Sequence, residues 1–164
     1  MLAELCSVAV GLGEIKISRN PADVLVAYGL GSCMGVGMYD PEARVGGLLH
    51  AVLPVRNGTG DVLAAKYVDT GLAQLLDELT QAGAERRRLI VRMAGGANML
   101  GMSDPARLFN IGQRNIVAAH EFLTAHRLRA QAQTVGGTAG RTMRVYVANG
   151  RMTVRSMGHH EQDI

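Results

Sequence analysis

Runs of apolar residues separated by glycines divide most of the chain into short segments with the pattern of strands. Alternation of apolar and polar positions, or a high content of β-branched residues, predicts strands over residues 5–10, 13–18, 23–28, 89–93 and 129–135. Residues 144–155 predict a β-hairpin, because Asn149-Gly150 between two such runs is a strong type I′ turn signal. Glycine, at 21 residues, is the main break between segments.

Two segments have helical periodicity instead. The first runs from about 61 to 81 and ends at Gly83, a residue suited to a helix C-cap. The second runs from about 111 to 126 and begins with Asn110 and Gln113, a pair that resembles a capping box. Five apolar residues of the first segment form one stripe, namely Val68, Leu72, Leu75, Leu76 and Leu79.

This order of segments predicts a layered α/β fold of α+β type, with mixed or antiparallel sheets and about two to three flanking helices. The chain has 164 residues, 48% of them apolar, which suits a single domain over residues 1–164 with one polar, frayed tail at 158–164. No apolar run approaches the roughly 20 residues of a membrane span. The start, Met1 to Glu4, has no basic region, so no signal peptide is expected.

Composition narrows the function further. Two cysteines and five scattered histidines suit neither a disulfide scaffold nor a paired-ligand zinc site, which predicts a reduced, cytoplasmic protein without a metal. The net charge is +3, and the only lysines are Lys16 and Lys66, so arginine supplies most of the positive charge. Arginine pairs bidentately with carboxylates, which favours an acidic protein partner. Aromatic residues are only 4%, which argues against nucleic acid.

Cys33 and His50 are the residues best suited to covalent chemistry. They lie on two adjoining predicted strands, over residues 33–39 and 45–53. The strands are joined by Asp40-Pro41-Glu42-Ala43, which favours a type I turn. A four-residue loop over 40–43 would place Cys33 directly opposite His50 on one face, with Cβ atoms about 4.5–5.5 Å apart. The thiol and the imidazole would then lie within reach of each other, as a nucleophile and its base require.

The same register predicts different surroundings for the two faces of this hairpin. Gly35 and Gly37 share the face of the Cys–His pair, and this face is expected to be bare and open to a substrate. Met34, Val36 and Met38 lie on the other face and are expected to pack into the core.

These residues suggest acyl transfer. The thiolate of Cys33 would attack an acyl carbon, and His50 would take the thiol proton and pass it to the leaving group. Main-chain N–H groups of the Gly31-Ser32 turn are candidates to hold the oxyanion. A catalytic thiol beside a histidine is expected to have a lowered pKa. The alternative is that Cys33 is a small buried apolar residue and His50 a satisfied strand histidine. Cys6 is expected to be a core residue.

Several short motifs accompany the Cys–His pair, in the order Gly29-Leu30-Gly31-Ser32-Cys33, Tyr39-Asp40-Pro41, Gly46-Gly47 with His50, Gly95-Gly96-Ala97-Asn98-Met99, Ile111-Gly112-Gln113-Arg114-Asn115, and Gly136-Gly137 with Gly140-Arg141. In this order and spacing, they resemble the CheD family, the chemoreceptor glutamine deamidases of bacterial and archaeal chemotaxis. The resemblance covers most of the chain, from about residue 11 to 155.

The resemblance implies a cysteine hydrolase that converts receptor glutamines to glutamates through a thioester, without a cofactor. Cys33 would be the nucleophile and His50 the base, and hydrolysis of receptor glutamate methyl esters would use the same groups. Gly95, Gly96 and Asn98 are candidates to line the pocket, although the glycines would also suit turns alone. The resemblance further implies chemoreceptor cytoplasmic domains as partners, possible competition by a CheC-type phosphatase, and a fold similar to that of the cytotoxic necrotizing factor deamidases.

The chain departs from the family pattern at one position. The third catalytic residue of the family is a threonine six positions before the cysteine, and here that position is Ala27. A third group normally fixes the orientation of the base. Three alternatives follow: a backbone carbonyl or a side chain such as Ser32 or Asn98 orients His50, or the activity is reduced, or the chain is a non-catalytic adaptor that binds chemoreceptors or a CheC-type phosphatase.

Overall fold

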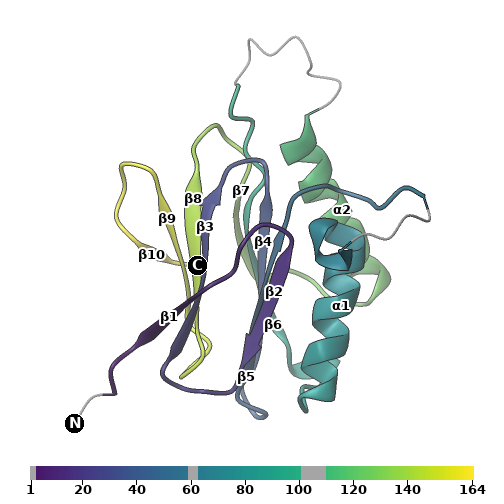
Figure 1. The fold of residues 1–164 in the computed structure, drawn as a ribbon. Coiled ribbons are helices and arrows are strands. Elements are labelled where there is room, and N and C mark those ends of the chain that lie inside the picture. The colour runs from purple at the N-terminus through teal and green to yellow at the C-terminus, as the bar shows by residue number, and fades with distance from the viewer. Residues whose placement is uncertain (1–2, 59–62, 101–109) are drawn as a thin grey trace.

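The computed structural model describes residues 3–58, 63–100 and 110–164, and these residues form ten strands, two α-helices and two 3₁₀ turns (Figure 1). The strands are β1 (Cys6–Ala9), β2 (Glu14–Ser18), β3 (Asp23–Leu30), β4 (Met34–Asp40), β5 (Val45–Ala51), β6 (Ile90–Gly95), β7 (Ala132–Val135), β8 (Arg141–Tyr146), β9 (Met152–Ser156) and β10 (Gln162–Asp163). The α-helices are α1 (Val68–Gln81) and α2 (Ile111–Ala125), and the 3₁₀ turns are η1 (Ala64–Lys66) and η2 (Arg86–Arg88).

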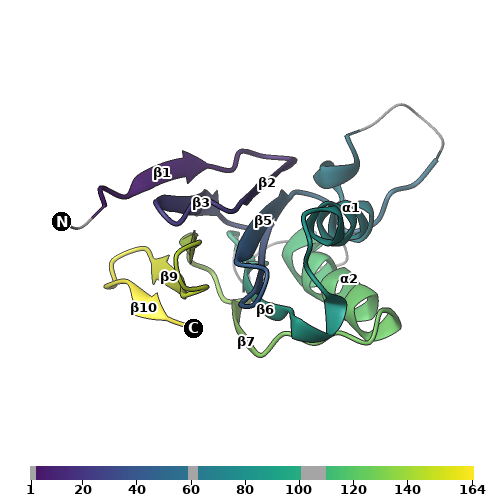
Figure 2. The same cartoon turned by 90° about the horizontal axis from the view of Figure 1, so that it is seen from below.

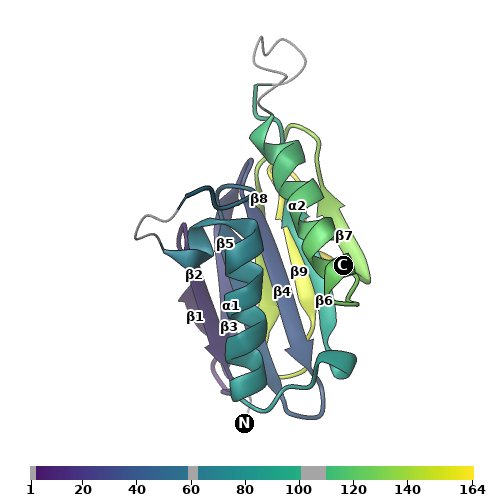
Figure 3. The same cartoon turned by 90° about the vertical axis from the view of Figure 1, so that its right-hand side faces the viewer.

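The strands form two five-stranded sheets that pack face to face. We call the sheet with the order β2-β5-β4-β6-β7 the helix-covered sheet, because α1 and α2 lie across its outer face (Figures 2 and 3). The other, with the order β1-β3-β8-β9-β10, is the outer sheet. Each sheet contains one parallel pair among antiparallel ones. The predicted layered α+β fold with mixed sheets is confirmed. No helix in the described ranges has the length and apolar character of a membrane span.

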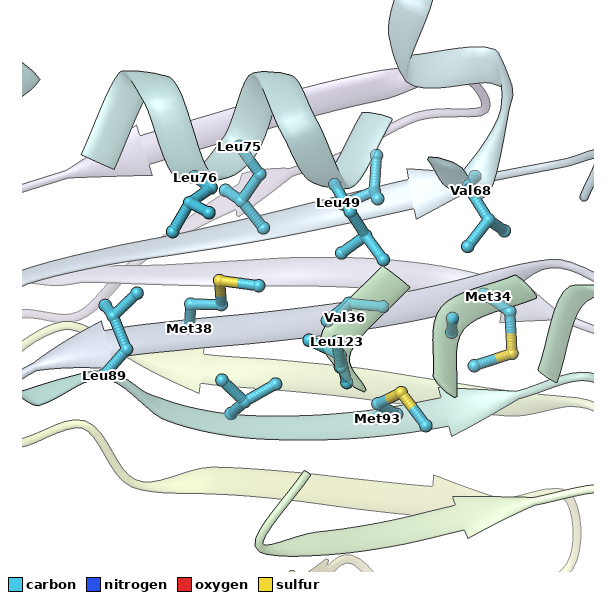
Figure 4. Close-up of a cluster of buried hydrophobic side chains, with 14 of the residues drawn as sticks. Met34, Val36, Met38, Leu49, Val68, Leu75, Leu76, Leu89, Met93 and Leu123 are labelled. Carbon is cyan, nitrogen blue, oxygen red and sulfur yellow. The ribbon is translucent and has the colours of Figure 1, made fainter. Parts of the chain in front are cut away.

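Two apolar cores hold the three layers together. The first lies between the helices and the helix-covered sheet, where Met34, Val36 and Met38 of β4 share one buried cluster with side chains of α1 and α2 (Figure 4). All five apolar residues of the predicted α1 stripe are buried there, as the periodicity indicates. The second core lies between the two sheets and includes Ala27 and Cys33. Cys33 therefore lies at the interface of the sandwich and not on a free sheet face.

The first helix begins later than predicted, at Val68 and not near residue 61. Residues 59–62 lie outside the described part of the chain. The preceding residues are paired with the end of β5 instead, because the Lys66 carbonyl accepts hydrogen bonds from the N–H groups of Val52 and Leu53, at 2.8 and 3.0 Å. The caps agree with the prediction: the Asn110 side chain accepts a hydrogen bond from the N–H of Gln113, and Gly83 has a φ of +101°.

The C-terminal part of the chain corrects two predictions. The β8–β9 hairpin has a loop over 147–150 instead of a two-residue type I′ turn, since the N–H of Val147 bonds to the carbonyl of Asp23. The predicted fraying of 158–164 is wrong over its last residues, where β10 pairs with β9. The hydroxyls of Tyr146 and Thr153 both donate to Glu161, which ties the chain before β10 to the outer sheet.

Candidate active site

Cys33 and His50 lie at the same end of the helix-covered sheet, but they are not direct cross-strand partners. The β4–β5 ladder pairs Gly35 with His50 and Met34 with Ala51, so the predicted register is wrong by two positions. A shift of two positions leaves every side chain on its face. Cys33, one residue before β4, is therefore diagonal to His50 on the same face, a relation with a typical Cα separation of about 7–8 Å.

The shift in register has its cause at the other end of the hairpin. Asp40 stays in β4 and pairs with Val45, so the loop consists of residues 41–44 and not 40–43. The Asp40 carboxylate accepts hydrogen bonds from the N–H groups of Glu42 and Ala43, at 2.9 and 3.0 Å, and Arg44 takes a φ of +52°. Pro41, Glu42 and Ala43 of the predicted loop lie in the observed loop, which is displaced by one position along the chain.

The face that carries Cys33 and His50 is not open, which corrects the second prediction from the register. A Cβ at Gly35 would lie 2.9 Å from Leu30 Cδ1, and one at Gly37 would lie 2.8 Å from Met152 Sδ. The glycines therefore make room for the outer sheet, not for a substrate. Cys33 is 9% exposed. A substrate must approach it from the end of the sandwich, where the turn over residues 31–33 lies.

His50 is held by the main chain of the segment between β1 and β2. Its Nδ1 lies 2.9 Å from the carbonyl oxygen of Val10. A carbonyl oxygen only accepts hydrogen bonds, so Nδ1 carries the proton and Nε2 carries the free lone pair. Nε2 is buried and has no hydrogen-bond partner among the described residues. Val10 and Gly13 are fixed in turn, because their N–H groups donate to the carbonyls of Val26 and His50, each at 2.8 Å.

These bonds identify the group that orients His50 in place of the family threonine. Of the orienting groups considered from the sequence, the one that bonds to His50 is a backbone carbonyl, that of Val10. Neither ring nitrogen of His50 bonds to Ser32 or Asn98, since Nδ1 bonds to Val10 and Nε2 has no partner among the described residues. Ala27 is fully buried in the core between the two sheets.

The turn that carries Cys33 is anchored through its carbonyls. The Gly31 carbonyl accepts from the N–H of Ala97 at 2.8 Å, and the Cys33 carbonyl accepts from the N–H of Gly96 at 2.9 Å. No described residue accepts a hydrogen bond from the N–H of Ser32. This arrangement leaves a main-chain donor next to the thiol, as an oxyanion site requires.

Gly95 and Gly96 support the main chain behind Cys33. Gly95 has a φ of +114°, and a Cβ there would lie 2.0 Å from the Cys33 carbonyl oxygen. Gly96 has a φ of +65°, and its Cβ would lie 2.4 Å from Ile116 Cγ1. Both positions therefore need glycine for close packing and for the backbone conformation. Both residues are buried.

Asn98 and Met99 lie beside the turn. The N–H of Asn98 donates to the carbonyl of Gly137 at 2.8 Å, which joins two of the glycine motifs. A Cβ at Gly31 would lie 3.1 Å from Met99 Cγ, and Met99 is 53% exposed, so its side chain covers the turn from outside. The motif over 95–99 thus surrounds the main chain of the cysteine turn.

Asn115 on α2 was not singled out from the sequence as a site residue, although it belongs to one of the motifs. It is fully buried, and its Nδ2 donates to the carbonyls of Ser32 at 2.8 Å and Val52 at 3.0 Å. One amide thus joins the residue before Cys33 to the segment just after His50. Its Oδ1 is buried and has no partner among the described residues. The available signal in the sequence was the spacing, because Asn115 is a polar residue on the same helical face as Gly112, Ala119 and Leu123.

Burial favours the uncharged forms of both reactive groups. It raises the pKa of the Cys33 thiol above 9.0, and the hydrogen bond from the residue's own N–H only partly opposes this. Burial also lowers the pKa of His50 below 6.5, against the opposing effects of the Val10 carbonyl and the charge of Glu14. The predicted lowering of the thiol pKa is therefore wrong. The resting site holds a neutral thiol and a neutral imidazole, and the thiol is not hydrogen-bonded to Nε2.

The remaining titratable groups do not form a metal site. Within residues 3–58, 63–100 and 110–164, no three His, Cys, Asp or Glu side chains come together as metal ligands. Cys6 is exposed in β1, which corrects its predicted burial.

The fold and the site define a layered α+β protein with a cysteine and an oriented histidine at one end of a β-sandwich, a combination suited to acyl transfer. The chain belongs to the CheD family. The family model "CheD chemotactic sensory transduction" matches residues 52–156, a stretch that begins after both Cys33 and His50.

Relatives extend the similarity over nearly the whole chain. A protein of Symbiobacterium thermophilum, named "Probable chemoreceptor glutamine deamidase CheD", is 43% identical over 95% of this chain and 96% of its own length. Proteins with the same name from Caldanaerobacter subterraneus and Desulforamulus reducens are 39% and 40% identical, each over 92% of this chain and 93% and 91% of their own lengths. Each alignment covers at least 92% of this chain, so it extends well before residue 52 and over the region of Cys33 and His50.

Proposed function

We propose that this chain is a cysteine-dependent protein-glutamine deamidase that acts on chemoreceptors. Its relatives are named as chemoreceptor glutamine deamidases, at 36–43% identity. The single observation that carries the proposal is the bond from His50 Nδ1 to the Val10 carbonyl. It leaves Nε2 unprotonated on the face of the sheet that also carries Cys33, as a general base requires.

In the first half-reaction, Cys33 Sγ attacks the carbonyl carbon of a glutamine side chain while His50 Nε2 accepts the thiol proton. The N–H of Ser32 stabilises the oxyanion of the tetrahedral intermediate. His50 then returns the proton to the departing nitrogen, the C–N bond breaks, and ammonia leaves. The product is a thioester between Cys33 and the substrate.

In the second half-reaction, a water molecule replaces ammonia. Nε2 accepts a proton from the water as its oxygen attacks the thioester carbon. Collapse of the second intermediate breaks the C–S bond, and the proton on His50 returns to the sulfur. The sum is glutamine plus water to glutamate plus ammonia, and neither half-reaction needs a cofactor.

Neutral resting groups suit this sequence of steps. Because burial keeps the thiol protonated and the imidazole neutral, proton transfer and nucleophilic attack are coupled, in contrast to a preformed ion pair. Asn115 and Val10 act as positioning residues, since both bind the main chain or the imidazole without reaching the reacting atoms.

The substrate class also suggests where the chain acts and with what. Its targets would be the cytoplasmic domains of chemoreceptors, so we place it in the cytoplasm. A CheC-type phosphatase that competes with receptor is a further prediction from the family resemblance. Copurification with such a phosphatase, and its displacement by a receptor fragment, would test that partner.

Mass spectrometry of a chemoreceptor cytoplasmic fragment tests the proposal directly. Incubation with the protein should raise the mass by about 1 Da at defined glutamines, and Cys33→Ala should abolish the shift. Cys6→Ala is the matched control, because Cys6 is a free cysteine in another strand. No shift with wild-type protein, while the fragment still binds, would overturn the proposal and favour the adaptor alternative.

A further inference from the structure

A groove opens beside the cysteine turn on the outer sheet. The β3–β8 register shifts between Ala27 and Leu30, and this bulge moves Tyr28 and Gly29 out of the ladder. Together with the ends of β8 and β9, these residues line a groove of about 390 Å³. Tyr28 is 51% exposed, and Met157 on the opposite wall is 77% exposed. No helix covers the outer sheet among the described residues (Figure 1). The exposed side chains of Tyr28 and Met157 therefore leave the groove open to solvent.

The groove is positively charged. Three arginines line it, Arg141, Arg144 and Arg155, and no acidic residue of the described chain does. Arg144 has one ion pair, a long contact of 3.9 Å with Glu161. Arg155 donates through Nε to the carbonyl of His159 at 3.3 Å, and no carboxylate of the described residues forms an ion pair with it. For comparison, the whole chain has a net charge of only +3.

The third arginine connects the groove to the candidate active site. Arg141 donates to the carbonyl of Gly95 at 3.0 Å and to that of Gly136 at 2.7 Å. Gly95 packs directly against the Cys33 carbonyl. Gly29 precedes Cys33 by four residues, so the groove lies within about 14 Å of the nucleophile along the chain. The groove is therefore within reach of a substrate segment that binds at Cys33 and extends a few residues toward the outer sheet.

We propose that this groove docks an acidic segment of the substrate, with carboxylates placed on Arg144 and Arg155 and apolar groups on Tyr28 and Met157. The proposal rests on the proposed function, because the occupant is the chain that contains the target glutamine. Each deamidation turns a neutral side chain into a carboxylate, so a segment that has already reacted would bind the groove more tightly than an unreacted one.

Peptide binding to the Cys33→Ala protein tests the groove apart from turnover. Two probes are compared by fluorescence anisotropy: a peptide with one glutamine flanked by glutamates, and the same peptide flanked by glutamines. The acidic peptide should bind about three- to tenfold more tightly, and added salt should reduce the difference. Arg144→Gln/Arg155→Gln should remove the preference.

The matched control is Arg86→Gln/Arg87→Gln, which removes the same charge from exposed arginines on η2, outside the groove. This variant should keep the preference for the acidic peptide. Equal loss of the preference in the two double variants would overturn the proposal, since only net charge would then matter. No preference in the parent protein would overturn it as well.

Deamidation, measured separately with wild-type protein, distinguishes the two proposals. A groove-dependent preference without any deamidation would overturn the proposed enzyme and leave the docking surface supported. Deamidation at equal rates for both peptides, without a groove-dependent preference, would support the proposed enzyme and overturn the docking surface.

Discussion

Strand β4 has buried ionisable groups near both of its ends. Those at one end are fully hydrogen-bonded, whereas those at the other end are not. At the C-terminal end, the fully buried Asp40 carboxylate binds the guanidinium of Arg88 at 2.8 Å and the N–H of Glu85 at 2.8 Å, besides the two N–H groups of its own turn. Burial alone would raise the pKa of Asp40, but these bonds outweigh it and lower the pKa to about 2.

At the N-terminal end, the buried groups are left partly unbonded. His50 Nε2 and Asn115 Oδ1 have no partner in the described part of the chain, and burial holds Cys33 and His50 in their neutral forms. An unpaired buried polar atom costs stability, typically about 1–3 kcal/mol. We infer from this contrast that the Asp40 end serves folding, whereas the Cys33 end keeps His50 Nε2 free for the proposed chemistry.

The strongest way to break this contrast is to remove the base. His50→Ala should lower kcat/KM for deamidation by about 10³-fold or more, because nothing else described at the site can take the thiol proton. Urea titration should show that the variant remains folded, so the loss of kcat/KM does not come from unfolding. Activity within tenfold of wild type would contradict the assignment of Nε2 as the base.

A variant at the Asp40 end of β4 should instead lose stability and keep its activity. Asp40→Asn should lower the free energy of unfolding by about 2 kcal/mol, since the partly buried Arg88 guanidinium loses its buried carboxylate and keeps its ion pairs with the more exposed Glu42 and Glu85. The folded fraction should keep its kcat/KM. In the wild type, the folded-state pKa of about 2 lies below 3.8, so the stability from Asp40 is complete above pH 3.8 and is lost as the pH falls toward 2. A loss below 1 kcal/mol in urea titration would count against a structural role.

A variant of Asn115 tests whether the Cys33 end of β4 depends on a positioning residue. Asn115→Ala should lower kcat by about 10- to 100-fold with little change in KM, because the turn carrying Cys33 and the end of β5 lose their common donor. Gln113→Ala is the matched control, since Gln113 is exposed on the same helical turn. A rise in KM with unchanged kcat would show that Asn115 serves binding and not positioning.

The pH dependence tests the neutral pair. The base-competent form of His50 should persist on acidification, so kcat/KM should fall only through a pKa below 6.5. Alkylation of Cys33 by iodoacetamide should remain slow at pH 8 and rise only above 9.0, measured in the Cys6→Ala background. Rapid alkylation of Cys33 at pH 6 would instead indicate a preformed thiolate.

The smallest effect is expected at the position that departs from the family. Ala27→Thr should change kcat/KM by less than about threefold, because the Val10 carbonyl already holds Nδ1. The larger side chain should cost about 1 kcal/mol, since Ala27 is fully buried between the sheets. A tenfold gain in rate would show that the carbonyl is a poor substitute for the hydroxyl.

The elements, and the faces of their residues, could be predicted from the sequence because local periodicity determines them. The α1 stripe, the Asn110 cap and the shared face of Cys33 and His50 follow from spacings of 3.6 and 2 residues. A two-residue error in register does not change the face, which is why the pair could be found despite the wrong turn.

The rest depends on contacts between distant segments. The register is fixed by Asp40, whose partners Glu85 and Arg88 come from a turn more than 40 residues away. Val10 reaches His50 across 40 positions, and Asn115 reaches Ser32 across 83. No local pattern encodes such bonds, and a main-chain carbonyl leaves no side-chain signal at all. The absence of a threonine at position 27 therefore said little about how His50 is held.

The most direct test of this account is the tautomer of His50. Two-bond ¹⁵N–¹H correlation spectra of the ¹⁵N-labelled protein distinguish Nδ1–H from Nε2–H imidazole, and His50→Gln identifies the resonance. The bond to the Val10 carbonyl predicts a neutral Nδ1–H ring at pH 7, which stays neutral to below pH 6.5. An Nε2–H ring at pH 7 would contradict the account, since Nε2 could not then accept the proton of Cys33.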